Sequence, residues 1–329
     1  MASVLVAPDS FKGTFSAVEV AEAIGRGLGA AGLEADLCPV ADGGEGTMET
    51  LLASIGGEVV EVEDVRGPLG TSIRAPFALV DGGRRALVEM AAASGLALIS
   101  EDERDPWVAT TYGTGQLIRA AVEAGAEEIM VAVGGSATVD GGRGALEALD
   151  ELGGVGDARI VVLCDVQTPW ERCAEIYGPQ KGADADMVSR LAERLDAYAT
   201  ELPRDPRGVA MTGAAGGLSG GLWAGLGAAL EPGAPYVLDA VRFDARLRGA
   251  AGVIAGEGRI DEQSVMGKIV GEIGERALAA GVPLHAIVGR NSVPEEAADR
   301  IALRSVREAT TLAEIQATAE RLGREIAAG

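Results

Sequence analysis

Short apolar runs recur along the whole chain, and each is followed by a polar, glycine-rich segment and then by a helical pattern. These runs occupy residues 4–7, 37–40, 129–133, 160–163, 253–255 and 284–288. Strands that are apolar throughout and alternate with helices are typical of parallel sheets covered by helices on both faces. This alternation constrains the fold more than any other feature, and it predicts the α/β class.

Two helices and one hairpin carry clear local signals. A helix is expected to begin at Ser16, since Glu19 completes the spacing of a capping box. The last helix begins in the same way, with Thr311 and Glu314. Residues 73–90 contain two apolar runs around an Asp-Gly-Gly turn, which predicts a β-hairpin. A hairpin is foreign to a purely parallel sheet, so this stretch interrupts the regular alternation of strand and helix.

The length of the chain predicts two domains. A single hydrophobic core stops growing at about 250 residues, and this chain has 329. The regular rhythm of strand and helix is present at both ends and is interrupted between them. We expect a discontinuous Rossmann/flavodoxin-like α/β domain at residues 1–66 and 246–329. A second α/β domain is expected to be inserted at residues 67–245, with the active site in the cleft between the two.

Composition excludes several classes of function. The chain carries 28 basic and 50 acidic residues, a formal net charge of −22, and only 3% aromatic residues. Such a surface repels nucleic acid and anionic membranes, so small molecules are the expected partners. The uncharged stretch 208–230 is rich in glycine, and we expect it to be a buried loop leading into a packed helix rather than a membrane span.

A single histidine and three cysteines narrow the chemistry. Cys38, Cys164 and Cys173 form no C-x-x-C pair, which indicates a cytoplasmic location and buried thiols. His285 lies in an apolar run and is expected to pack in the core. Proton transfer and metal binding therefore fall to Asp, Glu and Lys, and a metal held by carboxylates favours magnesium over zinc.

The glycine-rich segments follow the predicted strands at equivalent places, namely residues 8–13, 42–47, 134–138 and 256–261. Open α/β sheets bind ligands at the carboxyl ends of their strands, where glycine lets the backbone approach a phosphate. We predict phosphate or nucleotide chemistry, with tight strand–helix connections as the alternative. No Walker motif is present, since Ile269 follows Lys268 where a P-loop needs Ser or Thr.

Six motifs resemble, in the same order, the motif series of the bacterial type I glycerate kinases. They occupy residues 7–13, 41–47, 134–138, 177–183, 213–218 and 256–261. The resemblance implies a two-domain α/β kinase that uses ATP and Mg²⁺ to phosphorylate D-glycerate, typically to 2-phosphoglycerate, by in-line phosphoryl transfer. Val139 and Thr168 depart from the family pattern, and residues 150–159 form a shortened stretch. These departures predict looser discrimination among small 2-hydroxy acids.

The expected catalytic residues are Asp261, Lys12 and Asp42. Either carboxylate is placed to accept the proton of the substrate hydroxyl or to hold magnesium, and Asp261 is the preferred base. Lys12 is expected to neutralise the charge of the transferring phosphate. The alternative role of Asp261 is that of a helix N-cap.

The remaining assignments concern binding. The expected substrate-binding residues are Ser10, Ser136, Thr138, Arg259 and Lys268. The expected nucleotide- or phosphate-binding residues are Gly43, Gly44, Gly134, Gly135, Lys181, Gly216 and Gly217. Asp42 and Asp165 are the expected metal ligands.

Two other classes of function stay open. One is a kinase, phosphotransferase or acyltransferase that acts on another small hydroxy acid, and the other is a ligand-sensing relative of a kinase. Asp9, Lys12, Asp42 and Asp261 are all present, which argues against an inactive relative. A homodimer is a further open alternative.

Overall fold

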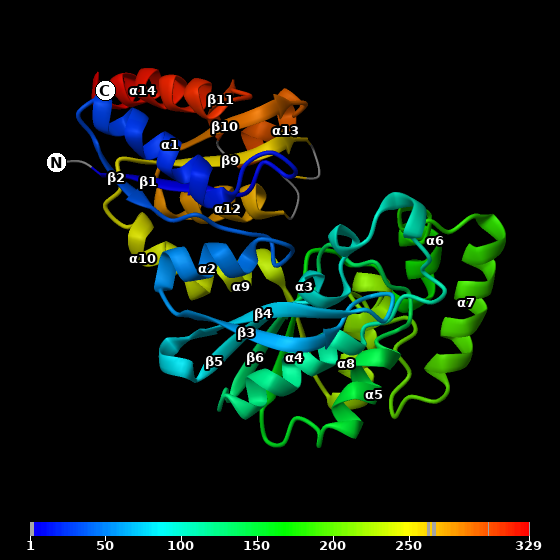
Figure 1. The fold of residues 1–329 in the computed structure, drawn as a ribbon. Coiled ribbons are helices and arrows are strands. Elements are labelled where there is room, and N and C mark those ends of the chain that lie inside the picture. Colours follow the sequence, from blue (N-terminus) through cyan, green and yellow to red (C-terminus); the bar gives the residue numbers. More distant parts are fainter. Residues whose placement is uncertain (1–2, 262–263, 265–267, 302, 329) are drawn as a thin grey trace. The chain divides into compact units, whose positions relative to one another are not determined.

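The computed structural model describes residues 3–261, 264, 268–301 and 303–328, and the chain forms two compact units (Figure 1). Unit 1 comprises Met1–Asp42, Glu49–Ile55 and Ala234–Gly329, and unit 2 comprises Gly43–Met48 and Gly56–Gly233. The divisions lie earlier in the sequence than the expected boundaries at residues 66 and 246. The reason is that residues 58–66 pair with the sheet of unit 2, whereas residues 235–244 bond to a helix of unit 1.

Unit 1 contains a sheet of five parallel strands in the order β11-β10-β9-β1-β2. The strands are β1 (Ser3–Pro8), β2 (Glu34–Leu37), β9 (Gly252–Ile260), β10 (Leu284–Asn291) and β11 (Leu303–Glu308). In order of appearance within the unit, this arrangement is the 2-1-3-4-5 order of flavodoxin-like folds. The predicted parallel sheet is confirmed. Its point of reversal lies between β1 and β9, where Val4 is paired with Gly252.

The helices of unit 1 are α1 (Ala17–Ala30), α2 (Thr47–Ile55, in this unit from Glu49 onward), α9 (Gly233–Ala240, from Ala234 onward), α10 (Phe243–Leu247), α12 (Ile269–Ala280), α13 (Glu295–Arg300) and α14 (Leu312–Ala328). Helices α1, α12, α13 and α14 pack against the five-stranded sheet. The capping box of α1 is confirmed, because Ser16 and Glu19 exchange backbone–side-chain hydrogen bonds of 2.9 and 3.3 Å. At α14, Glu314 N donates to Thr311 Oγ1 as expected, but the Glu314 carboxylate accepts from Thr310 N instead. Helices α1 and α14 lie side by side (Figure 1).

Unit 2 contains a six-stranded mixed sheet in the order β3-β4-β5-β6-β7-β8. The strands are β3 (Glu58–Arg66), β4 (Ser72–Val80), β5 (Arg85–Glu89), β6 (Glu128–Ala132), β7 (Arg159–Cys164) and β8 (Ala229–Pro232). Strands β3, β4 and β5 are antiparallel, and β5 to β8 are parallel. The predicted hairpin is therefore confirmed as β4 and β5.

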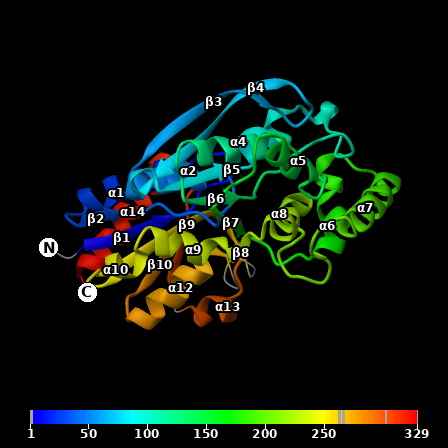
Figure 2. The same ribbon diagram turned by 90° about the horizontal axis from the view of Figure 1, so that it is seen from below.

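The helices of unit 2 are α3 (Ala91–Ser94), α4 (Tyr112–Glu123), α5 (Arg143–Glu151), α6 (Cys173–Tyr177), α7 (Ala185–Ala199) and α8 (Leu218–Leu226). Figure 2 shows α6 and α7 next to each other at the end of the unit beyond α8. These two helices enclose a small core of their own around Trp170, Cys173 and Leu195. The indole of Trp170 donates to the carbonyl of Leu195 at 3.1 Å, which fixes α7 against the preceding loop.

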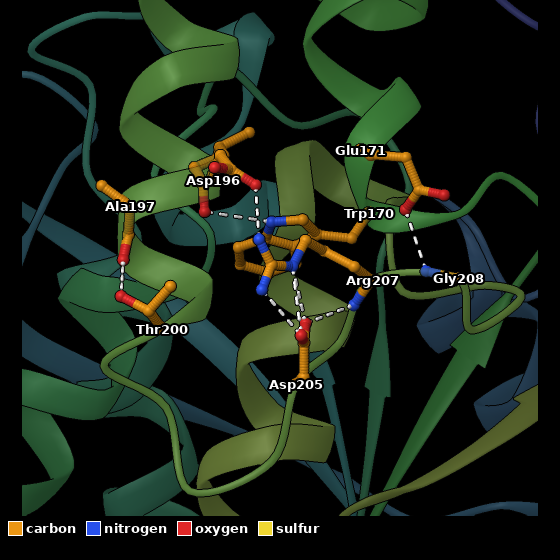
Figure 3. A network of polar contacts seen from close by, with 9 residues as sticks. Trp170, Glu171, Asp196, Ala197, Thr200, Asp205, Arg207 and Gly208 are labelled. Carbon is orange, nitrogen blue, oxygen red and sulfur yellow. Dashed lines mark hydrogen bonds and ion pairs between the residues drawn. The ribbon is translucent and has the colours of Figure 1, made fainter.

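Hydrogen bonds of Arg207 and Gly208 fix the start of the glycine-rich stretch 208–230. Arg207 bonds to Asp205 and Asp196, and Gly208 N donates to the Glu171 carboxylate at 3.1 Å (Figure 3). The chain then forms a buried turn, Ala214–Gly217, and enters the largely buried helix α8, as predicted. Within the part of the chain that the structure describes, no helix is long and apolar enough to cross a membrane.

Candidate active site

A pocket of about 500 Å³ lies at the carboxyl ends of β1 and β9 in unit 1. It is lined by Asp9, Ser10, Phe11, Lys12, Thr14, Asp42, Glu257, Gly258, Arg259, Lys268, Ile269, Gly289, Arg290 and Thr310. β1 and β9 are the two strands at which the strand order reverses, and ligands of flavodoxin-like folds bind at that point. Five residues that the sequence analysis selected meet in this pocket, namely Ser10, Lys12, Asp42, Arg259 and Lys268.

Two buried carboxylates, Asp9 after β1 and Asp42 after β2, contribute to the acidic side of this pocket. Lys12 Nζ lies 3.2 Å from Asp42 Oδ2, and the Lys12 side chain is mostly exposed whereas Asp42 is buried. Asp9 is also buried, and its Oδ1 accepts a hydrogen bond from Ser10 N at 2.6 Å. Burial, together with the negative charge of Asp42, raises the pKa of the Asp9 carboxyl to about 7.

Glu257 is the third acidic residue of this lining, and the sequence analysis did not select it. Its Oε2 accepts from Ser264 Oγ at 3.0 Å, while Oε1 is buried and has no hydrogen-bond partner among the described residues. Burial raises the pKa of this carboxyl to about 7. Asp9 lies inside motif 7–13 and Glu257 inside motif 256–261. Nothing in their sequence spacing indicates that Asp9 becomes buried and Glu257 partly buried.

The basic side of the pocket consists of Lys12, Arg259, Lys268 and Arg290. Arg259, Lys268 and Arg290 are exposed residues at the pocket rim. Four cations in one pocket are notable in a chain with a net charge of −22. This arrangement favours a ligand with several negative charges.

Asp261 is not among the described residues that line the pocket. Its carboxylate accepts from Ser264 N at 3.2 Å, and its own N–H donates to Ser264 Oγ at the same distance. These reciprocal bonds match the alternative of a turn or cap more closely than that of an exposed base. Ser264, which also donates to Glu257, connects Asp261 to the pocket wall.

A second pocket, of about 240 Å³, lies at the carboxyl ends of β6 and β7 in unit 2. It is lined by Leu96, Val133, Gly134, Gly135, Ser136, Asp165, Val166, Tyr177, Gln180, Lys181 and Ala215. Gly134, Gly135, Ser136, Asp165 and Lys181 were all selected from the sequence. Lys181 is 1% exposed, and its Nζ donates to Ser136 Oγ and to the Thr138 carbonyl, both at 2.7 Å.

Thr138 contributes to this second site through its backbone. Its Oγ1 is buried and has no hydrogen-bond partner within the described part of the chain. Gly216 and Gly217 have positive φ angles of 65° and 89°, and their Cα atoms lie against the backbone of residues 138–141. A side chain at Gly216 would collide with the Thr138 carbonyl. These two glycines therefore allow a close backbone approach that shapes the pocket.

Gly43, Gly44 and Gly134 pack tightly in the same unit. A Cβ on Gly134 would lie 2.7 Å from the Cα of Gly44, and one on Gly43 would lie 2.8 Å from the Cα of Gly233. Among the residues that the structure describes, no group of three or more His, Cys, Asp or Glu side chains is arranged to hold a metal ion. Of the two expected metal ligands, Asp42 lines the pocket of unit 1 and Asp165 that of unit 2.

Fold and pockets together define a two-unit α/β enzyme scaffold with charged sites at its strand ends. The sequence profile of the Glycerate kinase family matches residues 4–154 and 153–328. The chain is 40% identical over 326 residues to glycerate kinase of Bacillus subtilis, covering 87% of this chain and 84% of the relative. It is 38% identical over 303 residues to glycerate 2-kinase of Escherichia coli, covering 81% and 79%.

Comparison with solved structures indicates the same family. A crystal structure assigned to glycerate kinase 2 from Salmonella typhimurium LT2 matches with a TM-score of 0.86 and 35% identity, covering 100% of this chain and 99% of the other. This chain belongs to the glycerate kinase family, and it is a kinase.

Proposed function

We propose that this protein transfers the terminal phosphoryl group of ATP to D-glycerate and forms 2-phosphoglycerate. The observation that carries the proposal is the pocket of unit 1, where buried carboxylates and four cations meet at the reversal point of the sheet. The names of the relatives support glycerate as the substrate, and the Escherichia coli relative is a glycerate 2-kinase.

The polyphosphate of the nucleotide fits the pocket of unit 1 because that pocket has the cations to neutralise it. Lys12, Arg259, Lys268 and Arg290 would bind phosphate oxygens, and Lys12 would offset the charge that develops during transfer. Arg259 and Lys268, which the sequence analysis expected to bind the substrate, are thereby proposed to bind the nucleotide. Ser10, next to Asp9 in the same pocket, is retained as a polar contact for substrate.

The acidic residues of this pocket fit a magnesium ion that accompanies the nucleotide. Mg²⁺ is commonly held by one or two carboxylates together with substrate phosphates and water, so a cage of three protein ligands is not required. Asp42 is buried at the pocket, and the unpartnered Glu257 Oε1 indicates a wall that accepts positive charge. Bound Mg²⁺ would neutralise phosphate charge, and Asp42 is the proposed ligand in this pocket; Asp165, the other expected ligand, lies in the pocket of unit 2 and is not assigned to this ion.

A carboxylate must orient the attacking hydroxyl and take its proton. Asp261 is retained as the proposed base, with Asp42 as its competitor because Asp42 lines the pocket directly. Gly43, Gly44, Gly134, Gly135, Gly216 and Gly217 are proposed to shape the loops that approach the substrates. We expect both units to be required for the reaction.

The test is ADP release measured with and without D-glycerate, in MgCl₂ and in excess EDTA. We expect release only when ATP, Mg²⁺ and D-glycerate are all present. Phosphorus NMR of the product separates the two isomers, because phosphate on C2 couples to one proton and phosphate on C3 couples to two. If the rate of ADP release does not depend on D-glycerate, the proposal is overturned in favour of another hydroxy-acid substrate or a ligand sensor.

A further inference from the structure

Lys181 in unit 2 is a buried cation whose close partners are neutral. Its ammonium carries three N–H donors, and the two acceptors in contact with it are the Ser136 hydroxyl and the Thr138 carbonyl. Among the described residues, no carboxylate lies within ion-pair distance of its Nζ. A buried ammonium without a counter-ion is unfavourable, so its presence requires an explanation.

Asp140, the carboxylate whose charge acts on Lys181, does not supply that counter-charge by contact. Asp140 acts on Lys181 only at a distance, and its oxygens are occupied by Thr111 N and Oγ1 at 2.8 Å and by the N–H groups of Gly142 and Gly144. Asp140 thus holds the strand–helix turn together. Burial lowers the pKa of Lys181 to about 8, so the side chain remains largely protonated at neutral pH.

Lys181 lines the pocket of about 240 Å³ at the ends of β6 and β7, and its Nζ donates to the hydroxyl of Ser136, which lines the same pocket. The other walls carry the Ser136 hydroxyl, the Gln180 side chain and the Tyr177 ring, whose hydroxyl is hydrogen-bonded to Thr168 at 2.8 Å. Asp165 is the acidic residue of the lining. A single buried cation whose contacts are neutral suits a ligand with one carboxylate, whereas the neutral polar groups and the Asp165 carboxylate of the lining suit hydroxyl groups. This set of groups disfavours a polyphosphate.

We propose that Lys181 and Ser136 bind the carboxylate of the hydroxy-acid substrate. The assignment rests on the proposed function, since it gives the acid the smaller pocket and leaves the four cations of unit 1 to the nucleotide. It replaces the expectation that Lys181 binds nucleotide phosphate. Lys181 then selects acids over uncharged polyols, because only a carboxylate supplies the missing counter-charge.

The experiment compares wild type with Lys181→Met, which keeps the length of the side chain and removes its charge. Ser136→Ala is the second variant, and Lys268→Met in the other pocket is the matched control. We expect Lys181→Met to raise KM for D-glycerate by about 30-fold or more while KM for ATP stays nearly unchanged. Ser136→Ala is expected to act in the same direction but more weakly, and Lys268→Met is expected to show the reverse pattern.

Stability separates this effect from misfolding. Lys181→Met removes an unpaired buried charge, so its Tm is expected to equal or exceed that of wild type. Preference for D-glycerate over glycerol, which lacks the carboxylate, is expected to fall in this variant. A raised KM for ATP with an unchanged KM for D-glycerate would overturn the proposal and return Lys181 to the nucleotide.

A binding measurement without ATP tests the proposed carboxylate site independently of phosphoryl transfer. D-glycerate, lactate and inorganic phosphate are each titrated into wild type and Lys181→Met without ATP, with Tm as the readout. Stabilisation of wild type by the carboxylates, lost in the variant, supports the site even if no ADP is released. Stabilisation by phosphate alone, lost in the variant, contradicts it.

Discussion

Lys12 and Asp42 form an ion pair, with 3.2 Å between Nζ and Oδ2, that joins the loop after β1 to the loop after β2. The Lys12 side chain is 68% exposed, so the pair contributes little to stability. The pair instead holds the Lys12 cation in a pocket that is also lined by the buried carboxylate of Asp9.

The first prediction concerns Lys12. Lys12→Met removes the cation but no buried contact, so kcat/KM is expected to fall by roughly 10²-fold with an unchanged Tm. Steady-state kinetics and thermal melts on the same preparation measure the two effects. Lys12→Arg is the control, because it keeps the charge and should recover part of the loss. A Tm that falls with activity would show that Lys12 is structural.

The second prediction concerns the base. Asp261→Asn keeps the hydrogen bonds to Ser264 but removes the charge, and kcat is expected to fall by about 10²–10⁴-fold if Asp261 accepts the proton. ADP binding should be retained. Asp42→Asn is measured alongside, and it should weaken binding of the magnesium nucleotide. If Asp261→Asn keeps more than about a tenth of the activity, the base assignment moves to Asp42.

Glu257 leads to a prediction about stability and pH. Its folded pKa of about 7 lies above the ordinary value of 4.5, so the folded state binds more protons than the unfolded state between these values. Stability from this group is complete below pH 4.5 and is lost as pH rises through 7. Glu257→Gln is therefore expected to raise Tm by roughly 2–6 °C at pH 8 and to have little effect near pH 4.5. An equal shift at both pH values would contradict this account.

Lys181 yields a prediction about the pH dependence of substrate binding. Burial places its pKa at about 8, with Asp140 and Cys173 as the charged or titratable groups that act on it. Above that pH the ammonium loses its proton in the empty protein, so KM for D-glycerate should rise roughly tenfold per pH unit. Initial rates from pH 6.5 to 9.5 measure this dependence, and in Lys181→Met it should be absent.

The fifth prediction concerns substrate breadth. Val139 is fully buried against the α6–α7 core, and its carbonyl accepts from Arg194 at 2.8 Å. An apolar residue here adds no polar side-chain group beside Thr138. We therefore expect weaker discrimination among glycerate, lactate and tartronate than in a relative with Asn at this position. Equal selectivity of wild type and Val139→Asn in a side-by-side assay would refute it.

The central strands could be predicted from sequence, and the edge strands could not. β1, β6, β7 and β10 have neighbours on both sides and each contains a buried apolar run, so each stands out locally. The four edge strands were either missed or misplaced: β3, β8 and β11 were not predicted, and β2 runs over Glu34–Leu37 rather than residues 37–40. Edge strands tolerate polar residues, as the sequence EVVEVEDVR of β3 shows, so their apolar signal is weak.

The sequence by itself determined the α/β class, the capping of α1, the hairpin of β4 and β5, and the loops that carry the site residues. These features depend on neighbours within a few positions, where spacing and residue type are sufficient. Only the tertiary structure decided which loops share a pocket. Lys12 and Arg259 meet because β1 pairs with β9, whereas Lys181 and Ser136 meet in unit 2. It also decided that Asp9 and Lys181 are buried and that Glu257 is partly buried. Desolvation rather than residue type shifts their pKa values, because it depends on packing from distant parts of the chain.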